Sequence, residues 1–157
     1  MKYELAQINI GRILGPIDSP VMADFVANLD RINALAESSD GFIWRLKDES
    51  NNATSMAVFE DEYMIVNMSV WESVESLFQF TYQSAHVEIF KRRKEWFSKM
   101  KEMHMCCWYV PSGYRPTVEE AKQRLAYLNE MGETPWAFTF KSSFKPEDAV
   151  SYEDHSS

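Results

Sequence analysis

Alternating apolar and polar positions recur along the chain and predict β-strands. In the first such run, Ala6, Ile8 and Ile10 share one face of the predicted strand. Gln7 and Asn9 share the other face, so two amides fall where a half-buried strand offers a binding surface. The predicted strands cover residues 3–10, 42–47, 64–71 and 103–110, and a short edge strand is expected over 137–140.

Runs with a helical period separate these strands. Pro20 stands near the first position of the first predicted helix, after Asp18 or Ser19 as its N-cap. Thr117 and Glu120 form a capping box that begins the last one. The predicted helices cover residues 20–39, 73–100 with a bend near 83–85, and 117–131.

The resulting order is β-α-β-β-α-β followed by a C-terminal helix, which predicts an α+β fold of the ferredoxin-like kind. We expect one domain over residues 1–143 and a polar, acidic, frayed tail over 144–157. Such a sheet carries helices on one face only, yet the predicted strands have large apolar side chains on both faces. A second copy of the chain is the simplest cover for the other face, so we expect a homodimer.

Composition and charge narrow the classes of partner. Hydrophobic residues make up 45% of the chain and aromatic residues 14%, which favours a folded domain over disorder. The net charge of -8 repels phosphate backbones, and the basic cluster at residues 91–94 points in all directions, so no nucleic-acid partner is expected. No apolar run could span a membrane and none resembles a signal segment, so we expect a cytoplasmic protein without a membrane partner.

Cysteine and histidine positions argue against a disulfide or a metal site. Cys106 and Cys107 are adjacent in a predicted strand and point to opposite faces, so both should be reduced thiols. The common metal-ligand spacings are absent, and the pair His104 and Cys106 is too little to predict a metal site. Phosphate-binding loops and nucleophile elbows are also absent from the sequence, which disfavours kinases and hydrolases.

His86 occupies a position on the apolar stripe of the long predicted helix, and Arg93 follows one to two turns later. An imidazole there can act as a general base near neutral pH or as an axial ligand to iron. The alternative is a core histidine whose ring nitrogens are satisfied by a backbone carbonyl and a serine. Arg93 can bind a substrate carboxylate or phenolate, or pair with an acidic group of the protein.

Other polar and aromatic side chains offer further binding groups. Gln7, Asn9, Asn67 and Ser69 lie on strand faces that are otherwise apolar, where they bind a ligand oxygen or form a network between neighbouring strands. Four tryptophans can wall an aromatic ligand, or serve as core or dimer interface: Trp44, Trp71, Trp96 and Trp108. Tyr82 is either a phenolic proton donor or a half-exposed helix residue.

Several separated motifs resemble known proteins. The run WESVESL at residues 71–77, with Phe80 and the run SAH at 84–86, is similar to the strand-to-helix signature of the dimeric α+β-barrel, or antibiotic-biosynthesis-monooxygenase-like, superfamily. The runs NMSVWES at 67–73, RRKEWF at 92–97 and GYRPT at 113–117 resemble a bacterial branch catalogued only as a domain of unknown function. The resemblance covers residues 6–140.

This resemblance implies that two sheets pair into a dimeric barrel and that each subunit holds a cavity between sheet and helices. In the superfamily that cavity holds an aromatic substrate in cofactor-free oxygenases, or heme in heme-degrading members. The matching wall positions are Asn9 or Gln7, Trp71 and His86. Phe80 stands where the heme-degrading members have a tryptophan that distorts the macrocycle, which argues against heme degradation but not against heme binding.

Three hypotheses for function remain. The first is an enzyme acting on an aromatic or phenolic molecule without a cofactor, a monooxygenase or related isomerase or cyclase. His86 would be its base, and Asn67, Asn9 and Arg93 would hold the developing oxyanion. The second is a heme-binding protein with His86 as axial ligand, and the third is a ligand-binding dimer without turnover. The first is favoured, because Phe80 weakens the heme analogy and the polar strand faces suit an oxygenated small molecule, bound by Gln7, Ser69, Tyr82 and the tryptophans.

Overall fold

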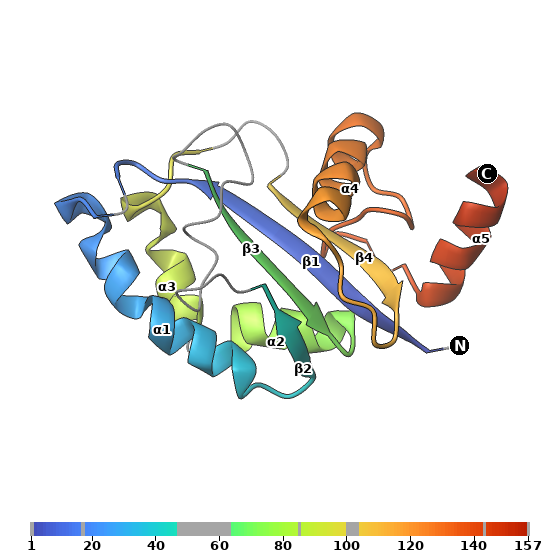
Figure 1. The fold of residues 1–157 in the computed structure, drawn as a ribbon, viewed down its shortest axis with the longest axis horizontal. Helices are drawn as coiled ribbons and strands as arrows, with labels where there is room; N and C mark the ends of the chain where they lie inside the picture. Colours follow the sequence, from blue (N-terminus) through green and yellow to red (C-terminus); the bar gives the residue numbers. More distant parts are fainter. Residues whose placement is uncertain are drawn as a thin grey trace.

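An antiparallel β-sheet forms the centre of the molecule, with helices on both of its faces (Figure 1). The computed structural model describes residues 2–16, 18–46, 64–84, 86–99, 104–142 and 144–156, without the side chains of 86, 89, 90 and 153–156. The strands are β1 (Tyr3–Arg12), β2 (Phe42–Arg45), β3 (Met64–Trp71) and β4 (Met105–Pro111). The helices are η1 (Pro20–Met22), α1 (Ala23–Glu37), α2 (Val74–Gln83), α3 (His86–Lys91), η2 (Arg93–Glu95), α4 (Val118–Met131) and α5 (Pro146–Ser156), where η marks a 3-10 helix. The predicted α+β class is confirmed.

Strand β1 lies inside the sheet, whose order is β2-β3-β1-β4 with every neighbouring pair antiparallel. Its register places Asn9 opposite Asn67 and Gln7 opposite Ser69. Directly opposed residues of antiparallel strands share a face, so these four polar side chains come together on one side. We call this side the α2 face, and we call the other side, which carries Ala6 and the even-numbered residues of β1, the α4 face.

The α4 face is buried within one chain. Ala6, Ile8 and Trp108 are inaccessible to solvent and pack in one cluster with residues of α4. The helix contributes its apolar side to this cluster through Ala121, Leu125 and Leu128. Because the chain itself covers this face, the argument that a second copy must cover it is wrong.

Helices α2 and α4 begin at hydroxyl caps where the sequence predicts their starts, whereas Ser19 precedes η1 without a side-chain cap hydrogen bond. The Ser73 hydroxyl accepts a hydrogen bond from Ser76 N at 3.2 Å, and the Thr117 hydroxyl accepts one from Glu120 N at 3.1 Å. Gly132 ends α4 with a φ of 78°, in the left-handed region that glycine adopts without strain. Strand β3 has the bounds that the pattern predicts, Met64–Trp71.

The helical region predicted over residues 73–100 is shorter in the structure than the apolar periodicity of the sequence indicates. It divides near the expected bend into α2 and α3, and α3 ends at Lys91. The chain then returns to the end of β1, where Leu14 N donates to Trp96 O and Ser98 N donates to Arg12 O, both at 2.9 Å. These backbone hydrogen bonds to a distant segment replace the helical ones, so η2 and an extended stretch follow in place of a continued helix.

The C-terminal residues form helix α5, not the frayed tail that their polar composition predicts. Several contacts between described residues hold this segment: the Tyr109 hydroxyl donates to Phe144 O at 2.7 Å, the hydroxyls of Tyr127 and Tyr152 hydrogen-bond each other, and the ring of Phe144 packs on that of Phe138. In place of the predicted edge strand at 137–140, two isolated bridges form, between Phe138 and Cys107 and between Ala137 and Thr134.

Cys106 and Cys107 are buried on opposite faces of β4 and form no disulfide. Burial raises the pKa of the Cys106 thiol from 9.0 to about 12, and burial also raises the pKa of Cys107. Between these two pH values the unfolded thiol ionises while the folded one stays protonated, so the unfolded state binds fewer protons. The free energy of unfolding should therefore fall as pH rises above 9.0, by about 1.4 kcal/mol per pH unit for each thiol.

Urea denaturation at several pH values above and below 9.0 tests this expectation. Cys106→Ala should show a shallower loss of stability with pH than the wild type, because one of the two buried thiols is gone. Equal slopes for the two proteins would contradict the assignment.

Candidate functional site

A group of polar side chains lies in the middle of the α2 face. We call it the polar strip: Gln7, Asn9, Arg45, Asn67 and Ser69. Three adjacent strands supply it, because the register aligns Ser69 of β3 with Gln7 of β1 on one side and with Arg45 of β2 on the other. Rigid sheet backbone therefore positions every member of the strip.

Hydrogen bonds fix the orientation of these groups. Gln7 Nε2 donates to Asn67 Oδ1 at 2.7 Å and to Ser69 Oγ at 2.8 Å, which uses both of its amide hydrogens. Trp71 Nε1 also donates to Ser69 Oγ, at 2.8 Å. Gln7 and Ser69 are 4% and 6% exposed, whereas Asn67 and Asn9 are exposed. The predicted network between neighbouring strands is thus present.

The network leaves hydrogen-bond donors for a ligand. The Ser69 oxygen accepts two bonds, so its hydroxyl proton is its remaining polar group. Asn67 accepts a hydrogen bond through its side-chain oxygen, so its amide nitrogen is the second donor. Two donors on neighbouring same-face positions of β3 suit an oxygen atom that carries negative charge.

Arg45 is a member of the strip that the sequence analysis missed. Residue Arg45 is 5% exposed. Its Nε donates a hydrogen bond to Glu37 Oε1 of α1 at 3.2 Å. A buried guanidinium beside Ser69 adds positive charge to the strip. The carboxylate of Glu37 offsets part of the free-energy cost of burying that charge. The available signal was a charged residue within the aromatic and aliphatic strand FIWR.

Aromatic side chains flank the strip at both ends. At one end Phe80 of α2 stacks on Trp71, with ring centroids 5.2 Å apart and planes at 29°. At the other end Trp96 and Phe97 pack with Phe25 in a second cluster. The ring of Phe97 lies over Gly11, two residues beyond Asn9 on the same face, where a Cβ atom would come within 2.6 Å of the ring.

The predicted aromatic wall is divided between the two faces of the sheet. Trp71 and Phe80 belong to the cluster on the α2 face, whereas Trp44 and Trp108 pack in the cluster on the α4 face. The four tryptophans therefore do not surround one site. Tyr82 is 40% exposed and contacts the rings of Phe78 and Phe140.

His86, the predicted base, and Arg93, its predicted cationic partner, belong to different helices. His86 is the first residue of α3, and its side chain lies outside the described residues. Arg93 begins η2 and is exposed at the surface, not on a buried helical stripe. Its predicted stripe position is lost because α3 ends before it.

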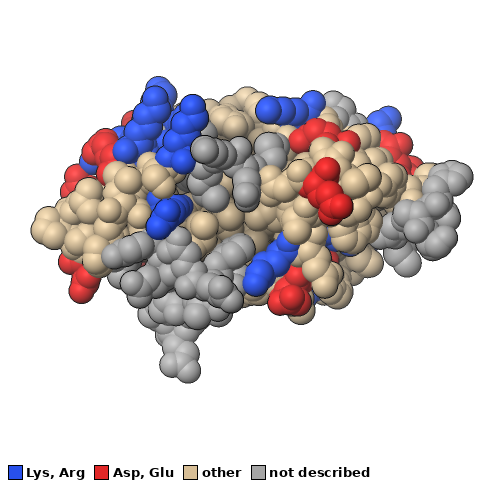
Figure 2. Space-filling model, turned by 90° about the horizontal axis from the view of Figure 1, so that it is seen from above, with Lys and Arg blue, Asp and Glu red and all other residues tan. Residues whose placement is uncertain are grey.

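Basic and acidic side chains are mixed on the surface. Figure 2 shows basic side chains at the end of the molecule that carries α1 and α3 and also over its middle and its other end, with acidic side chains at both ends. The guanidinium of Arg92, which lies between α3 and η2, pairs with Asp24 and with Glu95, each at 2.8 Å. Among the described residues, no group of three or more His, Cys, Asp or Glu side chains is arranged to hold a metal ion. None of the helices described has both the length and the apolar character needed to cross a membrane.

The fold and the polar strip together define an α+β protein whose central antiparallel sheet carries a group of oriented polar side chains. Within this class, the chain belongs to the family described as Domain of unknown function (DUF3291), which it matches over residues 4–154. The predicted membership of a branch catalogued as a domain of unknown function is confirmed. The antibiotic-biosynthesis-monooxygenase-like superfamily stays a prediction.

Two solved structures are similar over most of their length. PA3566 from Pseudomonas aeruginosa is 14% identical, with a TM-score of 0.42 over 74% of this chain and 98% of its own. The protein of unknown function NE2512 from Nitrosomonas europaea is 12% identical, with a TM-score of 0.44 over 73% of this chain and 94% of its own. Comparison with curated protein sequences gives no match.

Proposed function

We propose that the protein is an enzyme that acts on a small aromatic or phenolic molecule bound at the polar strip. The observation that carries this proposal is the double acceptance by Ser69 Oγ from Gln7 and Trp71, which leaves the hydroxyl as a donor beside the amide of Asn67. Phe80, which is half-buried and stacks on the buried Trp71, offers an aromatic surface for the ring of the substrate.

The chemistry that this arrangement supports is stabilisation of negative charge on oxygen. Removal of a proton from an acidic C–H or a phenol leaves an enolate or phenolate, the first step shared by cofactor-independent oxygenases, isomerases and cyclases. Donors already held by the sheet need no reorganisation when that charge develops, and the guanidinium of Arg45 adds a fixed positive charge. In this proposal His86 is the base, as the sequence analysis suggests.

We also infer that the fold is ferredoxin-like, because the order β2-β3-β1-β4 is the one that a split βαβ arrangement produces. The dimeric barrel stays a prediction. The argument that a second copy is needed to cover an apolar sheet face no longer supports it, because residues of the α4 face such as Ile8 and Trp108 are fully buried in one chain.

Asn67→Ala and Ser69→Ala test the proposal. Each should reduce kcat/KM for a responsive phenolic substrate by roughly 10- to 100-fold, because loss of one preorganised donor to an oxyanion has an effect of at least this order. Oxygen uptake and product mass spectrometry across a panel of phenols provide the measurement. Asn129→Ala, which removes an exposed amide from α4, is the matched control and should keep the wild-type rate.

Two results would contradict this function. One is full turnover in both variants at unchanged thermal stability. The other is no binding of any panel member to the wild type, combined with a sharp Soret band on titration with hemin that disappears in His86→Ala, which would favour heme binding.

A further inference from the structure

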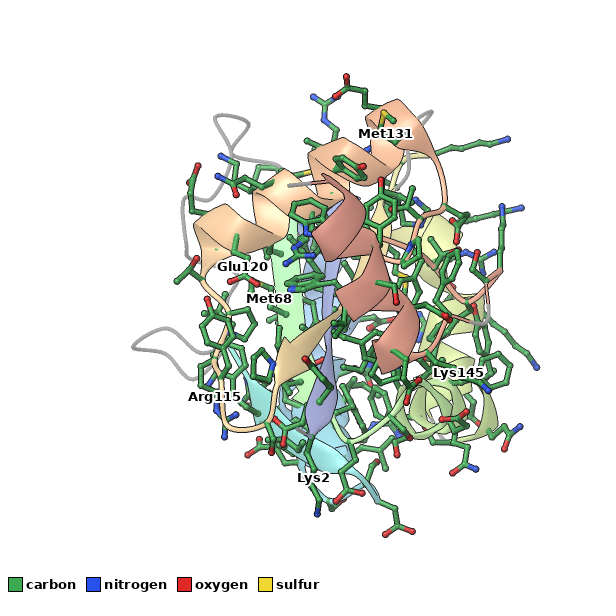
Figure 3. All side chains as sticks on the ribbon, turned by 90° about the vertical axis from the view of Figure 1, so that its right-hand side faces the viewer. Lys2, Met68, Arg115, Glu120, Met131 and Lys145 are labelled. Atoms are coloured by element: carbon green, nitrogen blue, oxygen red, sulfur yellow. The ribbon has the colours of Figure 1, made fainter. Side chains whose placement is uncertain are left out.

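A second candidate site lies at the β4 edge of the sheet, away from the polar strip. Here the ends of β1 and β4, the first turns of α4 and helix α5 line an open cavity of about 310 Å³. The side chains relevant to its chemistry are Tyr3, Tyr109, Tyr114, Glu120, Arg124 and Val150. Figure 3 looks onto this end of the molecule: α5 lies in front of the sheet, α4 lies above it, and Glu120 points from α4 toward the strands.

Glu120 is the acidic group of this cavity, and two donors orient it. Trp108 Nε1 donates to Glu120 Oε2 at 2.9 Å, and the Tyr114 hydroxyl donates to Oε1. The indole of Trp108 is fully buried, so this anchor is rigid. A carboxylate accepts about four hydrogen bonds, so it retains capacity for a ligand N–H.

Three tyrosines contribute aromatic walls, and the charges that act on them are mainly negative, although Arg124 acts on Tyr114 in the opposite direction. Burial raises the pKa of Tyr109 to about 12, with further contributions from Glu75, Asp148 and Glu147. The hydrogen bond to Glu120 raises the pKa of Tyr114. Both phenols are therefore neutral at physiological pH, and their ring faces attract cations.

Arg124 is the basic residue among the lining groups, and it is engaged with the tryptophans. Its Nη1 donates to Trp136 O at 2.8 Å, and its guanidinium lies 3.7 Å from the centre of the Trp136 ring and 6.0 Å from that of Trp108. This stacking holds the positive charge against the indoles, so Glu120 is the charged group that we assign to ligand recognition.

Helix α5 completes the cavity. Ala149 and Val150 of this helix line it. The hydrogen bond from Tyr109 to Phe144 O and the pairing of Tyr127 with Tyr152 hold α5 in this position. The cavity therefore depends on the C-terminal segment that composition alone assigns to a tail.

We propose that this cavity binds a small organic ammonium ion, with the N–H groups on Glu120 and the apolar body against the tyrosine rings. The proposal is independent of the function assigned to the polar strip. Its ligand class follows from one oriented carboxylate within aromatic walls.

Binding of three matched probes tests this assignment by isothermal titration calorimetry. Phenethylammonium should bind at least tenfold more tightly than the uncharged 2-phenylethanol, and 3-phenylpropionate should not bind. Tighter binding of the anion would identify Arg124 as the recognition group and overturn the proposal. Equal affinity for the ammonium and the alcohol, or no binding of either, would also overturn it.

Variants separate this site from nonspecific attraction to an acidic protein. Glu120→Gln should reduce the affinity for phenethylammonium to that for 2-phenylethanol, while Val150→Trp should fill the cavity and abolish both. Ser151→Trp places the same ring on an exposed neighbouring position of α5 and should bind like the wild type. Unchanged phenethylammonium affinity in both Glu120→Gln and Val150→Trp would show that the cation binds elsewhere.

Discussion

Replacing Trp71 by alanine should lower the free energy of unfolding by about 3–5 kcal/mol, the range typical of a buried aromatic side chain removed from a core. Trp71 is 1% exposed. Its ring contacts Phe42 at a centroid distance of 5.4 Å and stacks on Phe80 at 5.2 Å, so the substitution leaves a cavity that these rings cannot fill without leaving their own contacts. Equilibrium urea denaturation measures the effect.

Trp71→Phe is the control for the polar part of this residue. It keeps most of the apolar volume and removes the N–H that donates to Ser69. We expect a much smaller loss of stability than for alanine, together with a changed affinity for phenolic ligands. A loss for Trp71→Ala below about 1 kcal/mol, the level of many surface substitutions, would contradict the packing described here.

The second large effect is expected at Gly41, which connects α1 to β2. Gly41→Ala should cost about 2–4 kcal/mol, because two penalties combine. The backbone has a φ of 83°, which an L-residue adopts only with strain, and an added Cβ would collide with Oγ and Cβ of Ser76. Ser76 cannot move aside easily, since its N–H is bound by the helix cap of Ser73.

Gly113→Ala separates the two penalties. Gly113 also has a positive φ, of 89°, but a Cβ atom there would meet nothing within 4 Å. This variant should therefore lose only the conformational part, about 1 kcal/mol. Equal losses at Gly41 and Gly113, measured by urea denaturation, would show that the contact with Ser76 has no role.

The strands and the helix caps were predictable because their determinants are local. Alternation gave the bounds of β3, and hydroxyl side chains marked the starts of α2 and α4. The errors arose where distant contacts decide the structure. Residues after Lys91 leave the helix to pair with the end of β1, and α5 depends on tyrosines from β4 and α4.

The polar strip was predictable in part for the same reason. The period of β1 and β3 places Gln7, Asn67 and Ser69 on one face, and the pairing of the strands brings them together. The irregularity in β2 between Phe42 and Trp44 could not be predicted from the alternation of apolar and polar residues. It shifts the alternation by one residue, which sends Trp44 to the α4 face and turns Arg45 toward the strip.

The central position of β1 gives the protein two independent sets of sites along one strand. Its even-numbered positions, such as Ile8, specify the apolar interior beneath α4, while Gln7 and Asn9 at odd-numbered positions belong to the polar strip. Exchange of Gln7 and Asn9 leaves the interior beneath α4 intact, provided that the pairing frame is kept. A library randomised only at these two positions and at their partners on β3, Asn67 and Ser69, would therefore vary the polar strip on an unchanged scaffold.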